Sequence, residues 1–111
     1  MEYLLFIATD TEPDTSPDDD PDIYAWVAEG ERRGIRLRGD ALRPLEDATT
    51  IRVRDGQVLV TDGPYTESKE WIVGYDLLEC EDLDQAIDYV SRHPMARHGR
   101  IEIRPVRGLD E

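Results

Sequence analysis

Four runs of residues predict the strands of a sheet. Residues 2–9 are almost continuously apolar, and residues 71–80 place apolar side chains at both odd and even positions. Strands buried on both faces have this pattern, whereas half-exposed strands alternate. Residues 35–45 form a more polar run interrupted at Gly39, and residues 101–106 alternate weakly. We therefore expect four strands, of which the first and the longest are covered on both sides.

Two further segments have the spacing of helices with one buried face. Asp20 before Pro21 has the form of a helix cap and a first helical residue, and Gly34 has that of a C-terminal stop. The second helix is expected to begin after Asp82 and to end at Pro94. Apolar side chains recur in both at helical intervals, as Ile23, Trp26 and Val27 in the first and Leu83, Ala86, Ile87 and Val90 in the second.

The clearest local pattern in the chain is a β-hairpin. Two alternating runs, residues 49–54 and 57–61, flank the dipeptide Asp55-Gly56, which is typical of two-residue hairpin turns. This turn would place Val53 opposite Val58 and Ile51 opposite Val60 on one face, and Arg52 opposite Leu59 on the other. We expect the first face to pack and the second to lie mostly in solvent.

The order of these elements predicts an α+β fold, namely a ferredoxin-like βαββαβ arrangement with the hairpin inserted in its middle. The 111 residues suffice for one domain and leave no room for a second. Two helices cover only one face of such a sheet, whereas the first and longest strands are apolar on both. We therefore expect a second copy, related by a two-fold axis, to cover the other face as a homodimer.

Composition narrows the function classes. Thirteen basic residues against 26 acidic ones give a net charge of −13, which argues against direct binding of nucleic acid. No run is long and apolar enough for a membrane span, and residues 1–9 lack the basic start of a signal peptide. The lone Cys80 cannot form an internal disulfide. We expect a cytoplasmic protein with a buried, unreactive thiol.

Residues 10–22 form an acidic, proline-rich segment that we interpret as a solvated loop. Its aspartates suggest calcium binding as an alternative, but the spacing of a calcium loop and its distal glutamate are missing. A zinc site built from Cys80, His93 and His98 lacks suitable ligand spacing and a fourth group. The sequence therefore predicts no metal and, without a glycine-rich phosphate loop, no cofactor.

Residues 61–70, Thr-Asp-Gly-Pro-Tyr-Thr-Glu-Ser-Lys-Glu, join the hairpin to the long strand and are rich in turn and charged residues. This segment resembles the motif of the DGPF group of the YCII-related family, with Tyr65 in place of the phenylalanine. The resemblance extends in order and spacing to the hairpin, to the start of the second helix, to Arg92-His93-Pro94 and to residues 101–106.

The resemblance implies a dimeric α/β-barrel fold of the ferredoxin-like type. The function of the family is poorly defined. It has been suggested to be enzymatic, through a histidine and an aspartate, and some members are fused to or accompany extracytoplasmic-function sigma factors. In the YCII branch the histidine lies in the first helix and the aspartate precedes a proline at the end of the second. This chain has no histidine between Pro21 and Gly34 and has His93 before Pro94, so that dyad does not carry over.

Two residues are candidates for catalysis. Asp62 is a candidate general base, although Asp-Gly-Pro also serves turn structure, with a positive φ at Gly63. His93 is a candidate proton shuttle, although a cationic histidine also stabilises the end of a helix. The candidate ligand-binding residues surround them, and they are Arg52, Gly63, Tyr65, Glu67 and Lys69.

Two functional hypotheses follow. The first is a pocket near Asp62 and His93 that binds a small molecule or performs acid–base chemistry without a cofactor. The second is a non-catalytic regulatory module that interacts with a sigma-factor-related protein. It is motivated by the acidic surface and by the resemblance. A purely structural role is a third alternative.

Overall fold

A four-stranded antiparallel sheet with the strand order β2-β5-β1-β6 forms the body of the protein. The computed structural model describes residues 1–63 and 71–109. The strands of this sheet are β1 (Glu2–Thr9), β2 (Arg36–Ala41), β5 (Ile72–Glu79) and β6 (Gly99–Pro105). The helices are α1 (Ile23–Arg32), α2 (Leu83–Val90) and α3 (Met95–His98), and a separate two-stranded sheet consists of β3 (Thr49–Arg54) and β4 (Gln57–Asp62). The fold is a mixed α+β fold, and its strand order is compatible with a ferredoxin-like arrangement.

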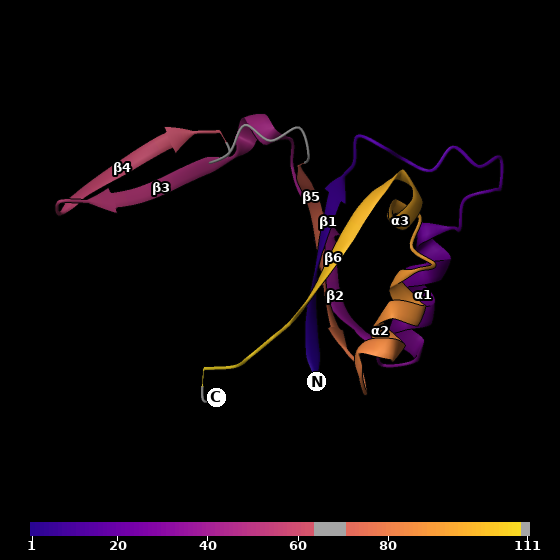
Figure 1. Cartoon of the computed structure of the whole chain (residues 1–111). Coiled ribbons are helices and arrows are strands. Elements are labelled where there is room, and N and C mark those ends of the chain that lie inside the picture. The colour runs from indigo at the N-terminus through magenta and orange to yellow at the C-terminus, as the bar shows by residue number, and fades with distance from the viewer. Residues whose placement is uncertain (64–70, 110–111) are drawn as a thin grey trace.

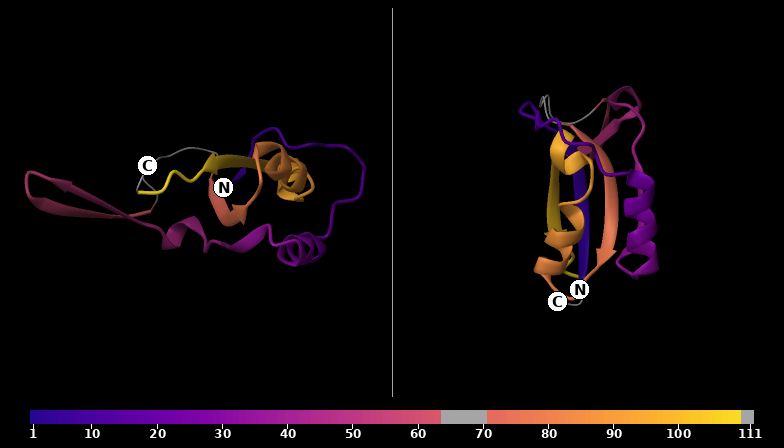
Figure 2. Two further views of the ribbon diagram at one scale, coloured as in Figure 1. Left: turned by 90° about the horizontal axis from the view of Figure 1, so that it is seen from below. Right: turned by 90° about the vertical axis from the view of Figure 1, so that its right-hand side faces the viewer.

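The helices cover one face of the four-stranded sheet (Figure 1; Figure 2). Tyr3, Leu5 and Ile7 of β1 point to this side and are at most 7% exposed. Alternate residues of the same strand, Leu4 and Phe6, are only partly covered. The buried core consists of residues from β1, β5, α1 and α2, with one residue just before β2 and one just after β5. Its members are Tyr3, Leu5, Ile7, Trp26, Ile35, Leu78, Cys80, Ala86, Tyr89 and Val90. The expected apolar character of both faces is present, but only one face is covered within a single chain.

The start of α1 differs from the prediction. Asp22, not Asp20, is the N-cap, and its carboxylate accepts a hydrogen bond of 2.9 Å from the backbone N–H of Tyr24. Asp20 instead bonds His98, with 2.6 Å between Oδ2 and Nε2, and is therefore engaged outside the helix. Gly34 follows the helix with a φ of 68°, as its predicted role as a C-terminal stop requires.

The second helix also ends earlier than expected. Asp82 caps it as predicted, and its carboxylate accepts a hydrogen bond of 2.8 Å from the N–H of Gln85. The helix ends at Val90, four residues before Pro94, and Pro94 instead precedes the short helix α3. No sequence pattern predicted α3, because four residues are too few to establish a helical period.

The second strand is shorter than residues 35–45, because residues 45–47 form a 3₁₀ helix. Gly39 does not interrupt β2. It pairs with Asp76 of β5, and a Cβ atom at Gly39 would lie 2.0 Å from the Oδ1 atom of Asp76. The glycine is thus required by the close approach of a buried carboxylate.

The hairpin has the predicted register, with Val53 opposite Val58 and Ile51 opposite Val60. Asp55 and Gly56 both have a positive φ, as a type I′ turn requires. The expectation that one face packs is wrong for the single chain, because every residue of β4 is exposed, as is every residue of β3 except Thr50. In Figure 1 and in the left view of Figure 2, the hairpin extends away from the helices.

Among residues 1–63 and 71–109, no helix combines the length and apolar character needed to cross a membrane.

Candidate functional site

A cavity of about 420 Å³ lies between α1 and the β2–β5 half of the sheet. Its volume is within the range of small-molecule sites. Apolar walls come from Ile7, Ile23, Trp26, Val27 and Val73, and the polar groups among its lining residues include Arg36, Asp76 and His93. A largely apolar cavity with a few polar groups is typical of a binding site.

Trp26 and Tyr89 hold the helical wall of this cavity in place. Their rings stack with centroids 4.1 Å apart. The indole N–H of Trp26 donates to the carbonyl of Tyr89 over 2.8 Å, and the Tyr89 hydroxyl donates to the carbonyl of Trp26 over 2.6 Å. Burial raises the pKa of Tyr89, so its hydroxyl remains a donor. Gly30 gives this hydroxyl room, because a Cβ atom there would lie 2.0 Å from it. These contacts join α1 to α2 and fix the indole that lines the cavity.

His93 lines the same cavity and is only 5% exposed. Its Nδ1 atom accepts a hydrogen bond of 2.9 Å from the backbone N–H of Met95, and its ring meets Trp26 edge-on with centroids 4.6 Å apart. Burial, and then the positive charge of Arg36, lower the pKa of His93 to about 4. The expected role of a cationic helix cap is therefore wrong, because the imidazole is neutral near pH 7.

The bond to Met95 also fixes the tautomer of His93. Since Nδ1 accepts, the proton of the neutral ring is on Nε2. No group among the described residues bonds to Nε2. At neutral pH, His93 is therefore equipped to donate a hydrogen bond from Nε2 to a ligand oxygen, and not to remove a proton with that nitrogen.

A second polar group of the cavity is the ion pair of Asp76 and Arg36. The Nε atom of Arg36 lies 2.8 Å from Oδ1 of Asp76, and the two side chains are 11% and 5% exposed. Arg36 also lies 3.4 Å from the exposed Glu31. Burial raises the pKa of Asp76, although its pairing with Arg36 opposes the change. The pair supplies a fixed, largely compensated charge beside His93.

The structure does not bring Asp62 and His93 together. Asp62 is exposed at the end of β4, on the hairpin, and does not line the cavity that contains His93. Gly63 has a φ of 101°, and its N–H bonds the carbonyl of Ala48 over 2.7 Å, as expected for turn structure. Arg52 lies on β3 opposite Leu59. The remaining candidates, Tyr65, Glu67 and Lys69, lie outside the described residues.

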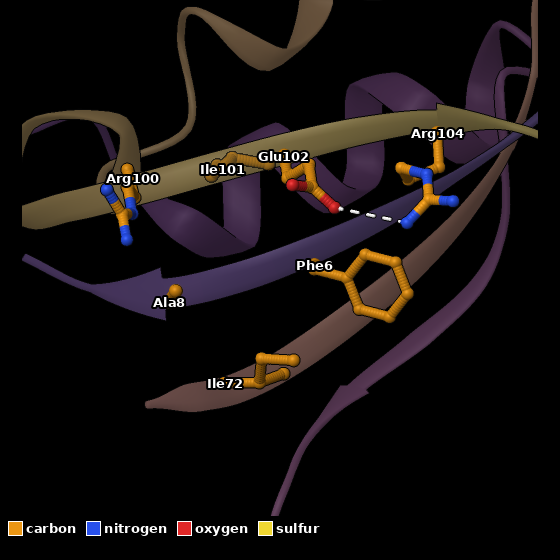
Figure 3. Close-up of a pocket in the computed structure, with 7 residues that line it drawn as sticks. All are labelled: Phe6, Ala8, Ile72, Arg100, Ile101, Glu102 and Arg104. Carbon is orange, nitrogen blue, oxygen red and sulfur yellow. Dashed lines mark ion pairs between the residues drawn. The ribbon is translucent and has the colours of Figure 1, made fainter. Parts of the chain in front are cut away.

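A shallower groove lies on the sheet face that the helices leave open (Figure 3). It has a volume of about 530 Å³. Phe6, Ala8 and Ile72 supply apolar surface, and β6 supplies Arg100, Glu102 and Arg104. Arg104 and Glu102 pair at 3.6 Å and are well exposed. We call this surface, Phe6, Ala8 and Ile72 with the outward residues of β6, the open-face groove.

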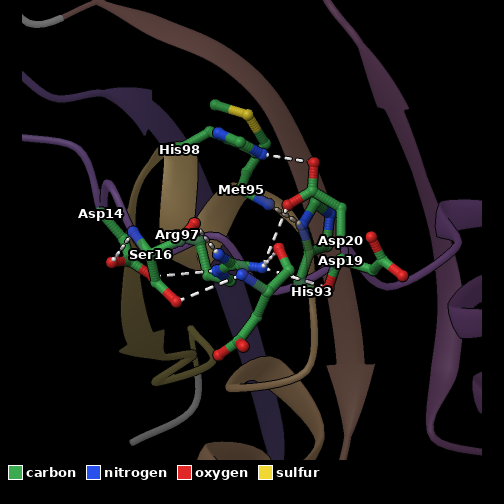
Figure 4. Close-up of polar contacts among 9 residues, drawn as sticks. Asp14, Ser16, Asp19, Asp20, His93, Met95, Arg97 and His98 are labelled. Atoms are coloured by element: carbon green, nitrogen blue, oxygen red, sulfur yellow. Dashed lines mark hydrogen bonds and ion pairs between the residues drawn. The ribbon is translucent and has the colours of Figure 1, made fainter.

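The acidic loop at residues 10–22 is exposed, as predicted, but it is anchored to the body by Arg97 (Figure 4). The guanidinium contacts the Asp14 carboxylate at 2.9 Å and the Asp20 carboxylate at 3.2 Å. It also donates to the backbone carbonyls of three loop residues, namely Ser16, Asp18 and Asp19. The N–H of Ser16 and the charge of Arg97 lower the pKa of Asp14. A guanidinium therefore binds two carboxylates of this loop, for which the sequence suggested calcium as an alternative.

The residues considered for zinc are separated in the fold. Cys80 is 3% exposed in the core, and burial raises the pKa of its thiol. His93 lies in the cavity, and His98 pairs with Asp20 on the surface. Within the described ranges, no group of three or more His, Cys, Asp or Glu residues is arranged to hold a metal ion.

Comparison with known proteins assigns the chain to a protein family. The model of the YCII-related domain matches residues 1–110. The chain belongs to the YCII-related family. The resemblance to the family is thus confirmed, and the narrower assignment to the DGPF-motif group stays a prediction.

One curated relative of this YCII-related chain is an uncharacterized protein of Rhizobium meliloti (strain 1021). The two are 37% identical over 67 residues. The match covers 59% of this chain and 54% of the relative, so the chain spans about half the length of the curated relative it matches.

The sequence did not predict two charged residues that line the cavity of this YCII-related chain, Asp76 and Arg36. Asp76 is the one acidic residue within the apolar run of residues 71–78, which was a usable signal because buried strands seldom carry an unpaired charge. Arg36 follows the buried Ile35 by one position but gave no such signal. Their pairing depends on the register of β2 and β5, which the polar sequence of β2 does not specify.

Proposed function

We propose that the protein binds a small molecule in the cavity between α1 and the sheet, with the Nε2–H of His93 as the donor that recognises it. The observation that carries this proposal is the hydrogen bond from Met95 to Nδ1, which leaves the ring N–H at Nε2 for a ligand. No buried side-chain nitrogen or oxygen among the described residues lacks a hydrogen-bond partner, so the unbonded Nε2 is an accessible atom of a largely buried residue, and a ligand oxygen can reach it.

The cavity favours a neutral, partly aromatic ligand that carries a carbonyl oxygen. Trp26 and the aliphatic side chains offer apolar and stacking contacts. Arg36 is the one cation among the described residues that line the cavity, and it is already paired with Asp76. The net charge of −13 disfavours anionic ligands at longer range.

Acid–base chemistry without a cofactor is the second form of this proposal. It would rest on Asp76, whose pKa burial raises, with His93 as a hydrogen-bond donor to the substrate. Asp62 would take part only if it approached the cavity from elsewhere, since it lies on the exposed hairpin of its own chain.

We further propose that the working unit is a homodimer of the dimeric α/β-barrel type, in which β3 and β4 are an insertion between β2 and β5. The support is the second face of the sheet. Leu4 and Phe6 are only partly covered there, and no helix of the described residues lies on that face of the sheet (Figure 2). A second copy would remove this apolar surface from water.

The binding proposal is tested by titration of the ¹⁵N-labelled protein with acetophenone, a neutral aromatic ketone, followed by NMR. We expect the amide signals of Trp26, Val27 and Met95 to shift. His93→Asn should weaken binding by about tenfold, because asparagine can replace the Nδ1 acceptor but not the Nε2 donor. His98→Asn, at the surface, is the matched control.

Two results would contradict the binding proposal. One is the absence of shifts near the cavity across a panel of small aromatic ketones and amides. The other is equal affinity of the wild type and His93→Asn, which would show that Nε2 does not contact the ligand.

A further inference from the structure

The β3–β4 hairpin carries an apolar face that none of the described residues covers. The alternation and register of the two strands place four aliphatic side chains on this face, and each is more than half exposed: Ile51 at 65%, Val53 at 56%, Val58 at 66% and Val60 at 63%. The opposite face of β4 is more polar and carries Gln57, Leu59 and Thr61, with Leu59 opposite Arg52. A contiguous apolar surface of this kind marks an interaction site.

The hairpin also projects from the body, so that the chain is less compact than a single domain of its length. The radius of gyration is 16.3 Å, whereas a compact domain of this length has about 13 Å. A two-stranded hairpin without further packing is at best marginally stable in water. Among the described residues, β3 and β4 form ladders only with each other. The hairpin therefore requires a surface that the chain alone does not provide.

The open-face groove is an unpartnered surface on the same side of the sheet. Figure 1 shows the hairpin and the helices on opposite sides of the sheet, and the view from below agrees (Figure 2). The groove lies on the face without helices and has an apolar floor that includes Phe6 and Ile72 (Figure 3). A two-fold axis at this face would place the hairpin of each copy on the open-face groove of the other. The apolar face of the hairpin and the groove would then be covered in both copies.

The distribution of charge favours contact between the hairpin of one copy and the groove of a second copy. Elsewhere the surface of the chain is more acidic, and two copies would repel each other there. In the hairpin, residues 49–62, two arginines are balanced by two aspartates, although the whole chain carries −13. The rim of the groove carries Arg100, Glu102 and Arg104, and so it too is not acidic. These are the surfaces on which two acidic chains can meet without strong repulsion.

We infer that the β3–β4 hairpin is a dimerisation arm whose apolar face packs on the open-face groove of a second copy of this chain, and that the exchange is reciprocal. This inference rests on the proposed homodimer and adds to it the element that makes the contact. Ile51, Val53, Val58 and Val60 supply the buried centre of the contact, and the charged residues of β6 form its rim.

The test compares two adjacent residues on opposite faces of the arm. In the full-length chain, Val60→Glu places a charge on the apolar face, and Thr61→Glu is the matched control on the other face. Sedimentation velocity is run over a range of concentrations. We expect Val60→Glu to raise the dissociation constant of the dimer at least about tenfold, because it buries an unpaired carboxylate, and Thr61→Glu to change it far less.

A cross-linking experiment identifies the surface that the arm contacts. The photoreactive residue benzoylphenylalanine replaces Val58 in one sample and Gln57 in the control. We expect position 58 to give dimers cross-linked to peptides of β1 or β6, and position 57 to give few. Circular dichroism of each variant verifies that the body remains folded.

The possible outcomes distinguish failure of the proposed homodimer from failure of the proposed dimerisation arm. A wild type that stays monomeric overturns both the homodimer and the arm. A dimeric wild type that Val60→Glu leaves intact, with no cross-link from position 58 to the groove, overturns the arm alone. Cross-links to a different protein or to the chain's own body also overturn it.

Discussion

The helix-covered side of the sheet and the β3–β4 hairpin have similar aliphatic sequences and opposite environments. Leu5 is completely buried beneath the helices, whereas Val58 is 66% exposed. Residues 3–7 and 58–60 are both rich in β-branched or aliphatic side chains, so the composition of a strand does not set its burial. The difference lies in what packs on each. The helix-covered side packs against α1 and α2, whereas the hairpin has no cover among residues 1–63 and 71–109.

The largest expected effect of a single substitution falls on the helix-covered side. Trp26→Ala removes a stacked, hydrogen-bonded indole that is 4% exposed, and we expect the free energy of unfolding to fall by about 4 kcal/mol. Urea unfolding below the dissociation constant of any dimer measures this. A loss below about 1 kcal/mol would mean that the indole is not part of the core.

Arg36→Met tests the buried ion pair. It leaves Asp76, which is 3% exposed, without its cation, and we expect a loss of about 3 kcal/mol at pH 7. Adding Asp76→Asn to the same chain should recover much of the loss, because the amide needs no counter-charge. Equal stabilities of the single and double variants would show that the pairing is not what Arg36 contributes.

Acidification should weaken the helix-covered side through His93. The pKa of His93 is about 4 in the folded chain and about 6.5 in the unfolded chain, so the unfolded chain binds the proton first as the pH falls. The neutral ring's contribution is complete above pH 6.5 and is lost between pH 6.5 and 4, up to about 3 kcal/mol. Asp76, with a raised pKa, acts in the opposite direction. The difference between the wild type and His93→Asn in urea unfolding therefore isolates the histidine, and a pH-independent difference would contradict this account.

The smallest effect is expected in the hairpin. Val53→Ala, at a side chain that is 56% exposed, should change the stability of the isolated chain by no more than about 0.5 kcal/mol. In hydrogen exchange, the hairpin amides of a dilute sample should exchange much faster than those of β1, and become protected as the concentration rises. Strong protection in the dilute sample would show that the chain covers the hairpin by itself.

Much of the fold followed from local patterns. The strand at residues 2–9, the cap at Asp82, the stop at Gly34 and the hairpin register were all predicted, because each depends on neighbouring residues. The cap of α1 was placed two residues early, since the sequence does not reveal that Asp20 contacts His98, which is 78 positions away.

The site was predicted only in part. His93 was selected for its ability to titrate near neutrality, but its burial and its bond to Met95 make it a neutral donor. Asp62 was selected for its motif and lies on the exposed hairpin. Asp76 and Arg36 belong to strands that pair across 40 positions, so no local pattern could join them.

The central claim is that His93 is a neutral, buried donor in a ligand cavity. The most direct test is an NMR titration of the ¹⁵N-labelled imidazoles, in which the 48% exposed His98 serves as the surface reference. We expect His93 to carry its proton on Nε2 and to gain a second proton only near pH 4. Protonation of His93 near pH 6.5, or a proton on Nδ1 at neutral pH, would contradict it.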